Sequence, residues 1–67
     1  MTEKLLKDIK VGEYFTLKAI EEPTENQVWV KDSFDRSTKK YDVYKFADVN
    51  HFSQKKGTTK VYVGFTF

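Results

Sequence analysis

The sequence is notable first for what it lacks. It has no cysteine, one proline, one histidine and three glycines in 67 residues. Without cysteine there is no disulfide and no thiolate zinc site, and a single histidine argues against a histidine-based metal site. His51 lies close to Asp48 and Asn50 in sequence, an arrangement more typical of a polar turn than of a cation site. We therefore expect neither a metal nor a cofactor.

Longer motifs are also missing. No uncharged apolar run is long enough to cross a bilayer, and the first ten residues lack the apolar stretch of a signal peptide. The sequence contains neither a nucleophile elbow nor a glycine-rich phosphate loop. These absences predict a cytoplasmic protein that has no membrane partner and is not an enzyme.

The short chain predicts a single domain over residues 1–67, with a small core. Cores of this size supply only about 3–5 kcal/mol of net stability. Aromatic residues make up 16% of the chain, and large rings bury much apolar area per residue. The core must therefore be rich in rings, or the protein must gain stability from a partner.

The region Gln27–Phe46 is predicted to be a β-hairpin, around which the rest of the fold is organised. Two runs rich in β-favouring residues, Gln27–Lys31 and Lys40–Phe46, flank a polar loop over Asp32–Lys39. Alternation of apolar and polar residues predicts further strands over Glu13–Ile20 and Lys60–Phe67.

The other segments are predicted to be helical or turn-like. Leu5, Leu6 and Ile9 predict one or two helical turns within Glu3–Lys10, laying Leu6 and Ile9 across one end of the core. The segment Ala47–Lys56 fits a turn or a short helical piece, with Val49 and Phe52 closing the other end.

These elements define a mainly β fold. We predict a small four- to five-stranded antiparallel SH3-like or partly open barrel with a short N-terminal helical turn. The alternative is a four-stranded sheet packed on an N-terminal helix. The predicted core consists of Phe15, Leu17, Val28, Val30, Val61, Val63 and Phe65.

Several segments together carry a resemblance that covers nearly the whole chain. They are Leu6–Phe15, Gln27–Val30, Asp35–Tyr41, Phe46–Asn50 and Lys60–Phe67. The chain resembles a group of small uncharacterised single-domain proteins of gut bacteria and their mobile elements. This resemblance implies a small β fold and brings no activity with it.

The outward face of the predicted sheet is the candidate binding surface. If the predicted core residues point inward, alternation leaves several aromatic rings pointing outward, with lysines nearby. Rings that stack on bases and lysines that contact phosphates are the usual means of binding single-stranded nucleic acid. The candidate residues are Tyr14, Trp29, Lys31, Tyr44, Lys45, Lys60 and Tyr62.

The distribution of charge points the same way. Residues 36–60 carry seven basic and two acidic side chains, a net charge of +5, whereas residues 1–25 carry a net charge of −2. Two simpler interpretations remain open. The rings stabilise the sheet as cross-strand pairs, or Trp29 lies in the core because the hairpin register differs by one residue.

Binding to another protein is the second functional hypothesis. A small core and an exposed sheet edge favour pairing with another chain, or with a second copy of this one. Phe34, in the predicted hairpin loop, either contacts such a partner or folds back over the end of the barrel.

Overall fold

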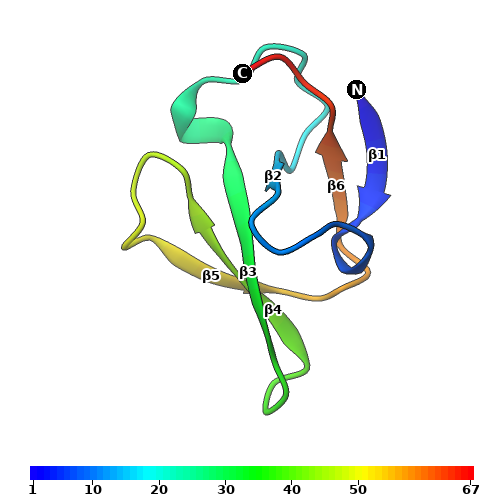
Figure 1. Ribbon diagram of the computed structural model, residues 1–67, viewed down its shortest axis with the longest axis vertical. Coiled ribbons are helices and arrows are strands. Elements are labelled where there is room, and N and C mark those ends of the chain that lie inside the picture. The colour runs from blue at the N-terminus through cyan, green and yellow to red at the C-terminus, as the bar shows by residue number, and fades with distance from the viewer.

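Six strands form two antiparallel sheets in a computed structural model that describes residues 1–67 (Figure 1). The first sheet pairs β1 with β6, and the second has the order β2-β3-β4-β5. A bridge between Thr16 and Tyr62 connects the two sheets. The strands are β1 (Thr2–Leu5), β2 (Tyr14–Phe15), β3 (Trp29–Asp35), β4 (Lys40–Lys45), β5 (Phe52–Lys55) and β6 (Lys60–Val63).

The prediction of a mainly β, antiparallel fold is confirmed, although six strands form instead of four or five. The sheets do not close, because β1 and β5 do not pair with each other. The SH3-like barrel therefore stays a prediction.

The helical turns predicted over Glu3–Lys10 are wrong. Thr2–Leu5 form β1, and only a single 3-10 turn, η1 (Leu6–Asp8), follows it. An eight-residue segment cannot sustain a helix alone, and pairing with β6 gives the backbone of Thr2–Leu5 partners along one edge. Leu6 and Ile9 are nevertheless buried, as expected.

The β3–β4 hairpin is confirmed, with a longer first strand than predicted. Its tip lies at the end of the molecule farthest from both chain termini (Figure 1). Asp35 pairs with Lys40, so the loop shortens to four residues, and Lys39 closes it with a left-handed φ of 58°. The Asp35 carboxylate accepts a hydrogen bond from the Ser37 amide at 2.9 Å, which together with Gln54 holds the pKa of Asp35 below its usual value.

The turn or helical piece predicted over Ala47–Lys56 is confirmed as a turn at Val49 and Asn50 and is wrong for Phe52–Lys55. Phe52–Lys55 form β5, which pairs with β4 and is the outer strand of its sheet. Val49 and Phe52 are 59% and 64% exposed, so they do not close the end of the core. Local sequence predicts an edge strand poorly, because its stability comes from the strand it pairs with.

The last predicted strand is shorter than expected. β6 ends at Val63, and Gly64 adopts a φ of 78°, a value that residues with a side chain rarely adopt. After this turn the chain carries Phe65 and Phe67 away from the direction of β6. Phe67 packs against the rings of Tyr14 and Phe46, and Phe65 packs against Phe67.

The main core lies between the two sheets. It consists of Leu6, Ile9, Phe15, Val43, Val61 and Val63, with Leu17, Trp29 and Tyr41 packed at its margin. Trp29 lies directly opposite Phe15, so both point toward this core. The alternative placement of Trp29 is therefore the correct one, and its predicted outward orientation is wrong.

Val28 and Val30 are buried on the opposite face of β3. Val30 lies opposite Tyr14 on β2 and Tyr44 on β4, which places all three on that face. The Phe46 amide donates to the Val28 carbonyl, which continues the same register. Val28 and Val30 are therefore buried as predicted, but outside the cluster that contains Phe15.

Four aromatic rings gather on this second face. Phe46 lies 5.3 Å from Tyr14 and 4.9 Å from Phe67 between ring centroids, and Phe65 lies 6.4 Å from Phe67. We call Tyr14, Phe46, Phe65 and Phe67 the aromatic cluster. Edge-on packing of this kind stabilises by about 0.5–1.5 kcal/mol per pair beyond the area buried.

We predict that Phe46→Ala lowers the free energy of unfolding by about 2–3 kcal/mol, because it removes two ring contacts and the cover over Val28. Phe52→Ala is the matched control. Phe52 is 64% exposed and lies near Tyr44 alone among the rings, so its loss costs less than about 1 kcal/mol. Urea denaturation measures both. Equal losses would contradict a stabilising role for the aromatic cluster.

Candidate functional site

The seven residues predicted to bind nucleic acid do not share one surface. Tyr14 and Tyr44 point to the face of the aromatic cluster, whereas Trp29, Lys31 and Lys45 point to the core face of the same sheet. Lys60 and Tyr62 belong to β6, in the other sheet. The structure therefore does not assemble the predicted aromatic platform.

Most of the predicted rings have partners within the fold. Tyr14 belongs to the aromatic cluster, and Tyr44 lies 6.4 Å from Phe52. The Tyr62 hydroxyl donates a hydrogen bond to Glu3 Oε1 at 3.1 Å, which raises the pKa of Tyr62. The contacts of these three tyrosines therefore stabilise the fold itself, through packing and hydrogen bonding.

Trp29 and Lys45 are half-buried, whereas Lys60 is exposed. Trp29 is half-buried, with the His51 ring on one side and Lys45 Nζ 5.6 Å from its ring centroid. Lys60 is exposed and lies opposite Leu5 of β1.

The outward placement of Lys31 is wrong. Its side chain is only 4% exposed, and its ammonium donates a hydrogen bond to the Ile9 carbonyl. The same ammonium lies 4.3 Å from the Tyr41 ring centroid, a cation–π distance. Burial lowers the pKa of Lys31, while the charges of Asp8 and Glu13 partly oppose this. A buried ammonium cannot contact a phosphate, so we remove Lys31 from the candidate interface.

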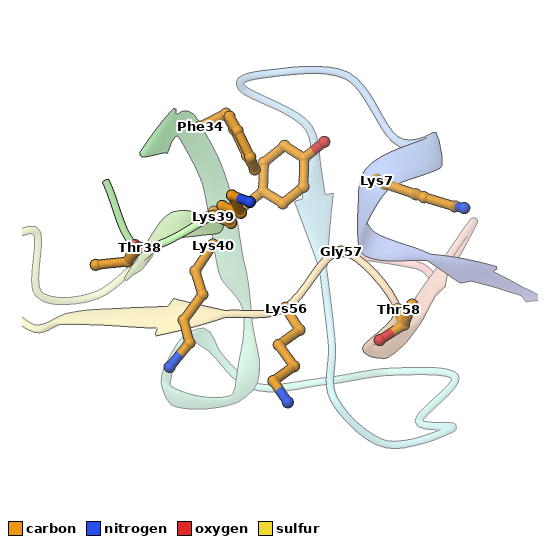
Figure 2. A pocket seen from close by; sticks show the side chains of 9 residues that line it. Lys7, Phe34, Thr38, Lys39, Lys40, Lys56, Gly57 and Thr58 are labelled. Carbon is orange, nitrogen blue, oxygen red and sulfur yellow. The ribbon is translucent and has the colours of Figure 1, made fainter. Parts of the chain in front are cut away.

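A different group of residues forms an open cleft of about 420 Å³ beside the tip of the β3–β4 hairpin (Figure 2). Its side chains come from η1, the hairpin and the turn between β5 and β6. We call it the Tyr41 cleft. It is lined by Lys7, Phe34, Thr38, Lys39, Lys40, Tyr41, Lys56, Gly57 and Thr58.

A β-bulge places both rings of the cleft on one side of the hairpin. Lys31 pairs with Val43, but Phe34 pairs with Tyr41, so β3 contains one extra residue between these pairs. Regular pairing without the bulge would put Phe34 opposite Lys40, on the face away from Tyr41. Their ring centroids are 4.9 Å apart, and Phe34 remains 46% exposed.

The glycine of the β5–β6 turn allows close contact at the base of the cleft. A Cβ at Gly57 would lie 3.1 Å from Tyr41 Cε2 and 3.1 Å from Lys7 Cβ, closer than ordinary side-chain contacts. The Gly57 carbonyl also accepts a hydrogen bond from the Lys7 amide at 3.0 Å. Gly57 therefore holds η1 and the ring of Tyr41 together.

The charge of the cleft is of one sign. Four of its nine lining residues are lysines and none is acidic. In Figure 2, Lys40 and Lys56 extend in the same direction, while Lys7 extends away on the far side of Gly57. The cleft thus combines two aromatic rings with a positively charged rim.

Two of the nearby carboxylates, those of Asp35 and Asp42, lie on the other face of the hairpin. Asp42 follows Tyr41 in β4, so its side chain points to the opposite face. Gln54 Nε2 donates to Asp35 at 3.0 Å and to Asp42 at 2.9 Å, which holds both carboxylates there. Lys40 lies directly opposite Asp35 and so leaves β4 on the same face as these carboxylates, although its long side chain still lines the cleft.

Of the residues of this cleft, reasoning from the sequence singled out Phe34 alone, although one signal pointed toward the lysines. Lys39, Lys40 and Lys56 all belong to the segment 36–60 with its net charge of +5. Tyr41 shares a face with Val43, as alternation along β4 requires. Lys7 comes from the acidic N-terminal third, and only the fold brings it to the cleft.

Searches against protein-family models, curated proteins and solved structures found no match for this chain. The resemblance to proteins of gut bacteria and their mobile elements therefore stays a prediction. The structure contains no helix long and apolar enough to cross a membrane.

We predict that Lys31→Met changes the free energy of unfolding by less than about 1.5 kcal/mol at neutral pH, because methionine fills a similar volume without a buried charge. The two proteins should differ more in how their free energy of unfolding depends on pH. Since the folded-state pKa of Lys31 lies below its ordinary value of 10.5, the unfolded chain binds more protons between the two values. Stability conferred by position 31 therefore rises with pH across this window.

Denaturation of both proteins at a series of alkaline pH values measures this effect. Their difference isolates Lys31, because Tyr62, whose raised pKa acts in the opposite direction, is present in both. The stability of the natural protein relative to Lys31→Met should increase toward pH 10.5. A constant difference would show that the ammonium is not desolvated.

Proposed function

We propose that this protein is a non-catalytic binding module that binds single-stranded nucleic acid at the Tyr41 cleft. The observation that carries the proposal is a pair of adjacent aromatic rings surrounded by four lysines with no carboxylate among the lining residues. Stacking of a base on a protein ring contributes about 1–3 kcal/mol, and lysines neutralise the flanking phosphates.

The residue types favour binding without sequence preference. The cleft contains no arginine, asparagine or glutamine, the side chains that read base edges in pairs of hydrogen bonds. Lysine acts as a point charge on a flexible stem and suits phosphate contacts. Such a site would bind a single strand through its backbone and through any base that stacks.

We infer further that the two sheets are an open relative of the predicted small barrel. The strands run in the continuous spatial order β1-β6-β2-β3-β4-β5 once the Thr16–Tyr62 bridge is included. Small barrels of this kind often present ligand-binding loops at one end. The hairpin tip and the β5–β6 turn occupy that position here.

Assembly of two copies along β5 is the competing function. β5 is an outer strand, and its first residue, Phe52, is 64% exposed. However, β5 is only four residues long and ends in Lys55, followed by Lys56. Short strands and lysines are features that protect an edge from pairing, so we favour the cleft.

We predict that a fluorescent oligothymidylate binds with a salt dependence set by the four lysines. The logarithm of the association constant should fall against the logarithm of salt concentration with a slope of about −2.8, or about −0.7 for each phosphate contacted. The double variant Lys40→Gln, Lys56→Gln should weaken binding roughly tenfold at low salt and reduce the slope to about −1.4.

The double variant Lys4→Gln, Lys10→Gln is the matched control. It removes the same charge from exposed positions outside the cleft and should change the affinity by less than about twofold. Fluorescence anisotropy measures all three proteins. Equal weakening by both double variants would show that only net charge matters, and a protein that binds no strand but sediments as a dimer would favour the β5 edge.

A further inference from the structure

The sheet face that carries Tyr41 continues beyond the cleft toward the other end of the hairpin. Residues two apart in a strand share a face, so Tyr41, Val43 and Lys45 point the same way. Their direct partners on β5 and β3 point that way too: Lys55 lies opposite Tyr41, and Trp29 lies opposite Lys45.

This face is accessible at its two ends and along β5. Val43 is a fully buried core residue, but Lys45, Lys55 and Trp29 are each only half-buried. Ser53, opposite Val43, is half-buried as well. A polar and basic strip therefore runs from Tyr41 along the border of β4 and β5.

Trp29 provides a second aromatic ring at the far end of this strip. Lys45 Nζ lies 5.6 Å from its ring centroid. The ring also opens onto a smaller cleft of about 220 Å³, which Lys18 and Gln27 help to line. Trp29 thus combines a ring and nearby lysines, as Tyr41 does.

The spacing of the two rings matches a short strand. Tyr41 and Lys45 are four residues apart, which corresponds to about 14 Å along an antiparallel strand. Stacked nucleotides rise about 3.4 Å each, so about four nucleotides cover this distance. Lys55 lies level with Tyr41 and Lys45 level with Trp29, so each ring has a lysine beside it for a flanking phosphate, and Ser53 lies between them opposite the buried Val43.

We propose that a single strand held in the Tyr41 cleft extends along the β4–β5 border to Trp29, so that about four nucleotides span the distance between two stacking rings. This inference rests on the proposed function. It adds the length of the ligand, the direction of the strand and a second point of contact that the Tyr41 cleft does not include.

The test uses oligothymidylates of two, four and eight nucleotides with the emission of Trp29, the only tryptophan. Anisotropy of a labelled strand, with the unlabelled lengths as competitors, gives the affinity of each. We expect the dinucleotide to bind without changing Trp29 emission. The longer strands should quench it and bind at least about tenfold more tightly.

Two variants locate the second contact. Lys45→Gln with Lys55→Gln should weaken the eight-nucleotide strand about tenfold and the dinucleotide much less, since each phosphate contact adds separately. Trp29→Phe keeps an apolar ring in the core margin while reducing the stacking surface, and should reduce the affinity gained between two and four nucleotides. Lys4→Gln with Lys10→Gln again serves as the control for net charge.

The outcomes separate this inference from the proposed function. If all lengths bind equally and Trp29 emission never changes, the extended path is wrong and the Tyr41 cleft stands. If the dinucleotide alone quenches Trp29 fully, the ligand binds at Trp29 itself and the path from Tyr41 is wrong. If no length binds, both the path and the proposed function are overturned.

Discussion

Burial of β3 on both faces is the constraint on which the rest of the structure depends. β3 is paired on both sides, by β2 and β4, and its alternate residues point into two separate apolar regions. One face carries Trp29 and Lys31 toward the main core, and the other carries Val30 toward the aromatic cluster. Each face needs its own cover, which a chain of this size supplies from both of its ends.

The two terminal segments provide that cover. η1 and the residue that follows it place Leu6 and Ile9 on the inner face, and Phe67 reaches the outer face after the turn at Gly64. This arrangement is unfavourable at Lys31, because its position on the inner face buries an ammonium group in the core. The Ile9 carbonyl and the Tyr41 ring compensate that charge, and the contact fixes the ring that forms the floor of the cleft.

The cleft lies where the hairpin extends beyond the covered part of the sheet. There the bulge in β3 turns Phe34 toward Tyr41, and Gly57 lets the β5–β6 turn approach the same ring. The lysines of the hairpin loop, η1 and the β5–β6 turn then meet without any carboxylate among them. The cleft therefore follows from the same packing that stabilises the fold, with no additional element.

Much of the hairpin was predictable, because alternation and a polar loop mark two paired strands. Which faces of the hairpin are covered was not predictable. Alternation places Val28 and Val30 on one face and Trp29 on the other, but it does not show that both faces are covered. The extra residue of the bulge, at Asp32 or Ser33, has no signature in the local sequence. The strand β5 is stable only because it pairs with β4, so the local sequence does not predict it either. Likewise, the +5 segment indicated basic residues near the cleft, but only tertiary structure brings Lys7 to them.

The most direct measurement is a titration of the labelled protein with a short oligothymidylate, followed through backbone amide chemical shifts in NMR spectra. The proposed site predicts the largest changes at Lys40, Tyr41, Gly57 and Thr58, with the aromatic cluster around Phe46 unaffected. Changes centred on Tyr14, Phe46 and Phe67, or no changes at all, would contradict the assignment of the Tyr41 cleft as the binding site.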